Sequence, residues 1–183
     1  MEKEIKNYQR LNAIATTGGV VIFGENADKD IPVAELKESF NLEYSAYNRS
    51  FTDLNLENAI ELYDSCVKEL LPDTVMIHIG SNSDYWENIA DFEQKYIQLI
   101  NHIKGLNKNV RVVVVSVEDE ETNRHLRNIA DSTRTEYQSI LHSSLWNPQS
   151  IKSVNSFVQS MGIFGNKRKA SAYDLAKIFF CCA

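Results

Sequence analysis

The residues that could do chemistry in this sequence lie shortly after runs of apolar residues. Glu25 and Asn26 follow the run 19–24, and Asn82 follows the run 74–80. A carboxylate can transfer a proton or bind a cation, and an amide can donate hydrogen bonds to a negatively charged oxygen. These residues are therefore the first candidates for a ligand-binding or catalytic site.

Apolar runs rich in β-branched residues predict the strands that would position these side chains. The predicted strands are 19–24, 43–49, 74–80, 110–117 and, as a candidate fifth strand, 136–142. The first, third and fourth runs lack polar alternation, which is typical of strands covered on both faces of a parallel sheet. The carboxyl ends of such strands meet at one edge, where α/β proteins usually build their sites.

Helical patterns alternate with these runs. The apolar spacing predicts helices over 55–71, 91–106, 122–137 and 148–161. Alternation of strands and helices along the whole chain predicts an α/β fold, a three-layer α/β/α sandwich around a parallel sheet of about five strands. The length of 183 residues fits a single domain spanning 1–183.

The composition narrows the classes of partner. Hydrophobic residues make up 43% of the chain and the net charge is −6, which argues against a nucleic-acid partner. We find no signal-peptide pattern and no apolar stretch long enough for a membrane span, so we expect a cytoplasmic protein without a membrane partner. The expected partner is a small molecule or a protein, and no cofactor motif is evident.

The segments at the predicted strand ends resemble the conserved blocks of the SGNH (GDSL-type) hydrolases, a family of esterases and lipases. "VVIFGEN" resembles the first block, a strand followed by Gly-Asp-Ser, and "YNRSFTD" resembles the second, Asn-x-Gly-x-x-Gly. "VMIHIGSNS" resembles the third, Gly-x-Asn-Asp, and "MGIFGNKRKASAYDLAKI" the last, Asp-Gly-x-His before a closing helix. The resemblance implies an SGNH hydrolase-like fold with flavodoxin-like architecture.

The family's catalytic residues can be transferred to this chain one at a time. In the family, the first-block serine is the nucleophile, and the last block supplies a histidine base with an aspartate that orients it. The resemblance places Asn26 at the nucleophile, Met161 at the orienting acid and Phe164 at the base. Asp53 falls at the second-block glycine, and Asn82 matches the asparagine that holds the oxyanion.

These replacements would remove the inherited mechanism. An amide at position 26 is not a nucleophile, and neither methionine nor phenylalanine can transfer a proton. The leading hypothesis is a catalytically inactive hydrolase-like protein, a pseudoenzyme that acts as a binding or interaction module. Glu25, Asn26 and Asn82 are then the candidate ligand-binding residues.

Two other functions stay open. A working esterase could use a rebuilt site, with a nucleophile or base drawn from Ser81, Ser83, Thr52 and Glu25. This alternative predicts a titratable group with a perturbed pKa within reach of a hydroxyl. A phosphate binder of flavodoxin type is disfavoured, because the turn after the first strand is rich in acidic residues and would repel phosphate.

Simple structural roles compete with each functional one. Asn82 could cap the following helix, and Glu25 with Asn26 could serve the local turn. His78, within an apolar strand, is most simply a hydrogen-bonded core group. Glu25, Asp28 and Asp30 could gather a hard cation, but their spacing matches no known loop, so we expect no metal site.

Overall fold

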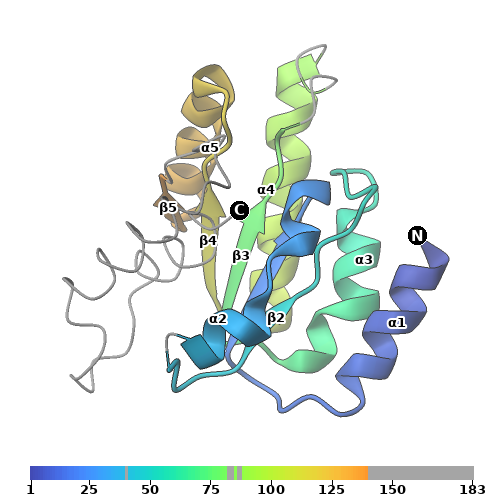
Figure 1. The fold of residues 1–183 in the computed structure, drawn as a ribbon. Coiled ribbons are helices and arrows are strands. Elements are labelled where there is room, and N and C mark those ends of the chain that lie inside the picture. The colour runs from blue at the N-terminus through green and yellow to red at the C-terminus, as the bar shows by residue number, and fades with distance from the viewer. Residues whose placement is uncertain (40, 82–84, 86–87, 140–183) are drawn as a thin grey trace.

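The computed structural model describes residues 1–39, 41–81, 85 and 88–139. Within these residues a five-stranded parallel sheet has the order β2-β1-β3-β4-β5 (Figure 1). The strands are β1 (Val20–Gly24), β2 (Ala46–Asn48), β3 (Thr74–His78), β4 (Arg111–Val115) and β5 (Glu136–Gln138). All five predicted strands are confirmed, and the four that lie wholly within the described residues are each somewhat shorter than predicted.

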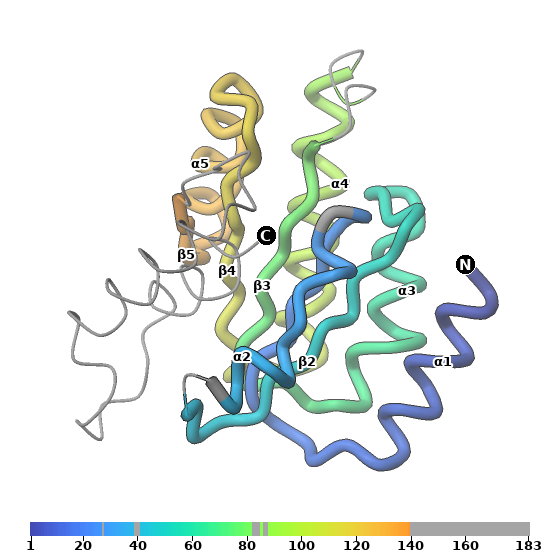
Figure 2. Tube along the Cα trace, viewed as in Figure 1, coloured from blue at the N-terminus to red at the C-terminus, as the bar shows by residue number. Residues whose placement is uncertain are grey.

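Helices connect the strands, as Figure 2 shows along the chain. They are α1 (Glu2–Asn12), α2 (Val33–Ser39), α3 (Ala59–Cys66), α4 (Ile89–Leu106) and α5 (Glu120–Thr133), with 3-10 turns η1 (Asn26–Asp30) and η2 (Lys68–Leu70). The prediction of a helix over 91–106 is confirmed by α4. The sequence patterns did not predict α1 or α2.

The predicted helix over 55–71 begins later, at Ala59. The side chain of Asn55 accepts the backbone N–H groups of Glu57 and Asn58 at 3.0 and 3.2 Å. Such local bonds from an asparagine hold the backbone in a turn and compete with helix formation.

The predicted helix over 122–137 ends at Thr133. Arg134 takes a left-handed conformation with φ of 52°, which stops the helix, and β5 starts two residues later at Glu136. The predicted helix 148–161 lies outside the described residues.

The main core lies on one face of the sheet. Odd-numbered residues of β1 and β3 and even-numbered residues of β4 point to this face, where they pack against α3, α4 and α5: Val21, Phe23, Val75, Ile77, Val112 and Val114. Ile5 and Tyr8 of α1 pack at the margin of the same core. The short helix α2 lies on the other side of the sheet (Figure 1). Among the described residues, no helix has the length and apolar character needed to cross a membrane.

Candidate functional site at the carboxyl edge of the sheet

The turn after β1 folds back over the end of its own strand. η1 begins at Asn26 and brings Asp28 against Gly24, the last residue of β1. A Cβ atom at position 24 would lie 1.8 Å from Asp28 Oδ2, so no side chain fits there. The glycine that ends the strand is therefore required by the packing of Asp28.

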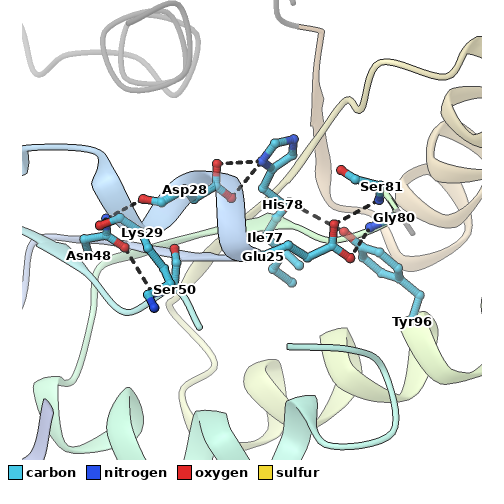
Figure 3. A network of polar contacts seen from close by, with 10 residues as sticks. All are labelled: Glu25, Asp28, Lys29, Asn48, Ser50, Ile77, His78, Gly80, Ser81 and Tyr96. Carbon is cyan, nitrogen blue, oxygen red and sulfur yellow. Dashed lines mark hydrogen bonds and ion pairs between the residues drawn. The ribbon is translucent and has the colours of Figure 1, made fainter. Parts of the chain in front are cut away.

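Asp28 and His78 form a buried pair between η1 and the end of β3 (Figure 3). His78 Nδ1 lies 2.9 Å from Asp28 Oδ1 and 2.8 Å from Oδ2. His78 is 7% exposed and Asp28 is 1% exposed. Two parts of the chain that are far apart in the sequence are thus joined by a charge-assisted contact away from solvent.

The charge state of His78 follows from its surroundings. Burial alone lowers the pKa of His78, because it penalises the cation. The charge and hydrogen bond of Asp28 raise it, and the charge of Glu25 and the backbone of Ser116 add to this effect. The net shift of the His78 pKa is upward, so the imidazolium form is favoured. The prediction that His78 is a hydrogen-bonded core group is confirmed.

Glu25 holds the loop that follows β3. Its carboxylate accepts the backbone N–H of Gly80 at 3.1 Å and that of Ser81 at 2.9 Å, as Figure 3 shows. The hydroxyl of Tyr85 donates to the same carboxylate at 3.4 Å. Two backbone donors and a phenol make a good environment for an anion, and here the anion comes from the chain itself.

Asn48 connects the end of β2 to the turn after β1. Its Nδ2 donates to the carbonyl oxygen of Asp28 at 2.6 Å, and its Oδ1 accepts the N–H of Ser50 at 3.0 Å. The N–H of Phe51 donates to the carbonyl of Gly24 at 3.1 Å. The loops after β1, β2 and β3 are therefore joined by side-chain and backbone bonds into one polar edge.

The residues that the family resemblance singled out divide into two groups. Asn26 and Asp53 lie on exposed turns after β1 and β2. Asn82, Met161 and Phe164 lie outside the described residues, so their expected meeting with Asn26 stays a prediction. The ligand-binding role of Glu25, Asn26 and Asn82 also stays a prediction.

The three acids considered for a cation do not form a cluster. Asp28 faces His78, while Glu25 faces the loop after β3. Over the described ranges, no group of three or more His, Cys, Asp or Glu residues could hold a metal ion.

Two further histidines are paired with acids on the helices. His102 Nε2 lies 2.9 Å from Asp64 Oδ1, between α4 and α3. His125 Nδ1 lies 2.7 Å from Glu93 Oε1, between α5 and α4. His142 lies outside the described residues. Each described histidine thus has a carboxylate partner.

Comparison with known proteins gives a likeness of structure. No family model matches the sequence, and no curated protein matches it. Among solved structures, a GDSL-like lipase from Bacteroides thetaiotaomicron VPI-5482 is similar over 86% of this chain and 98% of its own, with 15% identity and a TM-score of 0.55. The acetyl xylan esterase AlAXEase is similar over 89% and 96%, with 14% identity and a TM-score of 0.59.

At these identities the likeness shows the fold alone. The chain has the α/β fold of GDSL-like hydrolases, as its sequence blocks led us to expect. Function does not follow from fold, because proteins that share one fold can catalyse different reactions or none at all.

Two features of this edge were missed by sequence reasoning. One is the pairing of Asp28 with His78; the other is a contact from Glu4 of α1 to Lys29 and Thr52. A weak signal for the first existed: Gly24 precedes Asp28 by one turn, and a histidine stands near the end of the third predicted strand, 74–80. The second had no signal, because the N-terminal segment carries no motif.

Proposed function

We propose that this chain is a hydrolase-like domain without esterase activity, acting as a binding or interaction module through the carboxyl edge of its sheet. The observation that carries the proposal is Asn26, an exposed amide on the turn after β1, where the family resemblance expects a serine nucleophile. An amide cannot open an ester by nucleophilic attack.

The environment of His78 supports the same reading. A rebuilt esterase needs a titratable base within reach of a hydroxyl. His78 has a raised pKa, but Asp28 and the backbone of Ser116 account for its hydrogen bonds. His78 is also only 7% exposed, so its ring has little access to a substrate at this edge.

Two hydroxyl groups near this edge, those of Ser50 and Thr52, are buried or already bonded. The Ser50 side chain is fully buried, and Thr52 is bonded to Glu4 and Lys29. Ser50 therefore cannot meet a substrate, and the hydroxyl of Thr52, although the residue is exposed, is already bonded to two side chains. At this edge the exposed amide of Asn26 can donate and accept hydrogen bonds, which suits binding better than covalent chemistry.

Hydrolysis of short-chain p-nitrophenyl esters tests the proposal. We expect the purified protein, an Asn82→Ala variant and a heat-denatured sample to hydrolyse the esters at the same background rate. Turnover by the wild type that Asn82→Ala abolishes would overturn the proposal, because it would reveal a working oxyanion site.

An Asn26→Ser variant makes the test sharper. A serine alone lacks a base, since Phe164 stands where the resemblance expects histidine, so we expect no gain in turnover. A loss of all three triad members lowers turnover by about 10⁶ in a serine protease. If the single change produced clear turnover, a base would already be in place and the proposed inactivity would be wrong.

A further inference from the structure

The first turn of α1 reaches the carboxyl edge through one side chain. Glu4 Oε1 lies 2.8 Å from Lys29 Nζ on η1. The same oxygen accepts the Thr52 hydroxyl at 2.9 Å and the Thr52 backbone N–H at 3.3 Å. Three donors from two different loops therefore converge on a single carboxylate oxygen.

All three donors come from the loops that follow β1 and β2. Lys29 comes from the turn after β1 and Thr52 from the turn after β2, and Lys29 also donates to the Thr52 hydroxyl. The side chains of Glu4 and Lys29 are 20% and 31% exposed, so solvent reaches the contact. A small solute could reach the same donors if the carboxylate of Glu4 were absent.

The carboxylate fits its surroundings closely. Burial alone would raise the pKa of Glu4. Hydrogen bonds from Lys29, the amino terminus and Thr52 outweigh burial and lower the pKa to about 2. Glu4 is thus ionised at every ordinary pH, and its contact with the two loops has the character of a bound anion.

The middle and the end of α1 are attached to the domain by other contacts. The Tyr8 hydroxyl donates to the Ser50 carbonyl at 2.5 Å. The buried guanidinium of Arg49 donates to Asn12 Oδ1 from Nη2 at 2.7 Å and from Nε at 3.0 Å, and lies over the Tyr8 ring at 5.0 Å. The helix therefore has a firm attachment at its middle and end, and Glu4 is a separate contact at its start.

We propose that Lys29 and Thr52 form a binding site for a carboxylate group, which Glu4 occupies as a tethered ligand. The site takes a singly charged carboxylate in preference to a phosphate, because Lys29 is the cation that the two loops supply, and the acidic residues Asp30 and Asp53 lie beside Lys29 and Thr52 in the sequence. The ligand is the carboxylate of a small organic acid or of a peptide. A free ligand competes with Glu4, whose tether gives it a high effective concentration.

Removal of the tethered ligand and its replacement from solution test the site. We expect Glu4→Ala to lower the melting temperature, and sodium acetate in excess to restore part of the loss, about 2–4 °C. Sodium chloride at equal ionic strength and neutral acetamide should restore none of it. Equal recovery with acetamide would overturn the proposal.

Two matched variants control the experiment. Glu2→Ala removes an exposed glutamate whose ion pair, within the described residues, is with Lys6 on the same helix, so acetate should not affect this variant specifically. Lys29→Met added to Glu4→Ala should abolish the recovery, because it removes the cation of the site. Recovery that persists without Lys29 would place the acetate elsewhere and contradict the proposed site.

A direct readout covers the case in which Glu4→Ala hardly changes the melting temperature. The backbone N–H of Thr52 should shift on titration with acetate in amide NMR spectra of Glu4→Ala and should shift far less in Glu2→Ala. A short peptide with a free terminal carboxylate, compared with its amide, distinguishes a peptide ligand from a small acid. If the Thr52 resonance moves with neither acetate nor peptide, the site does not exist.

This inference does not depend on the catalytic state of the chain. Melting temperatures and amide shifts report carboxylate binding, whereas ester turnover reports the proposed inactivity. Either proposal can therefore fail while the other holds.

Discussion

Two kinds of histidine–carboxylate pair occur in this molecule, and they differ in their distance from water. His78 and Asp28 are buried at the end of the sheet, with side chains 9% and 2% exposed. His125 and Glu93 join α5 to α4 with a similar contact of 2.7 Å, but their side chains are 24% and 35% exposed. The chemical groups are nearly the same, and only the surroundings change.

This difference in exposure decides how much each pair contributes to stability. A half-exposed pair contributes little, because water solvates the separated groups almost as well. In a buried pair each partner depends on the other, since removal of one leaves an uncompensated charge out of water. The buried pair also sets the path of the turn that carries Asn26, whereas the exposed pair only joins two helices that already pack together.

The largest expected effect comes from breaking the buried pair. His78→Leu leaves the Asp28 carboxylate without its cation, and we expect a loss of about 3–5 kcal/mol in the free energy of unfolding. Urea denaturation measures this loss. The double variant His78→Leu/Asp28→Ala should lose less than the sum of the two single changes, and strict additivity would show that the two groups do not interact.

A substitution at Gly24 tests the packing of the same turn without changing the charge of Asp28 or His78. Gly24→Ala puts a methyl group 1.8 Å from Asp28 Oδ2, so the turn must move, and we expect a loss of about 1–3 kcal/mol. Gly105→Ala is the matched control: it lies in α4 with no atom within 4 Å of the added Cβ. That change should stabilise the protein by about 0.5–1 kcal/mol. Thermal denaturation separates the two, and a neutral Gly24→Ala would contradict the described packing of Asp28.

The buried pair should also make stability depend on pH. The pKa of His78 is higher in the folded state than its ordinary value of about 6.5. Its contribution is therefore complete below about pH 6.5 and is lost as the pH rises through the folded-state pKa. Urea denaturation at a series of pH values from acid to alkaline should show this fall in the wild type. The same slope in His78→Leu would assign the fall to another group.

The contrast between the pairs also shows how far the sequence alone could reach. The strands followed from their β-branched runs, and the placement of His78 in an apolar strand indicated a hydrogen-bonded role. Its partner could not be predicted, because Asp28 lies 50 residues away and meets it only through a turn that folds back over Gly24.

The N-terminal helix escaped prediction for a different reason. Apart from Ile5, Tyr8 and Leu11, α1 is built of polar and charged residues, so its apolar stripe is narrow although the three residues recur at helical spacing. Specific polar contacts fix it on the domain, such as the bond from Tyr8 to the Ser50 carbonyl. Contacts of this kind depend on the folded arrangement of distant loops and leave no periodic pattern in the sequence.

The smallest expected effect comes from the exposed pair. Glu93→Gln removes the charge opposite His125 while keeping the shape of the side chain. Because both groups are partly solvated, we expect a change below about 1 kcal/mol, and less at high salt, where surface charges are screened. Asp28→Asn is the matched change in the buried pair and should cost several times more under the same conditions. Urea denaturation of the two variants at low and high salt gives the comparison directly. Equal losses would mean that burial does not govern these pairs, and the role assigned to the His78–Asp28 pair in shaping the turn at Asn26 would lose its physical basis.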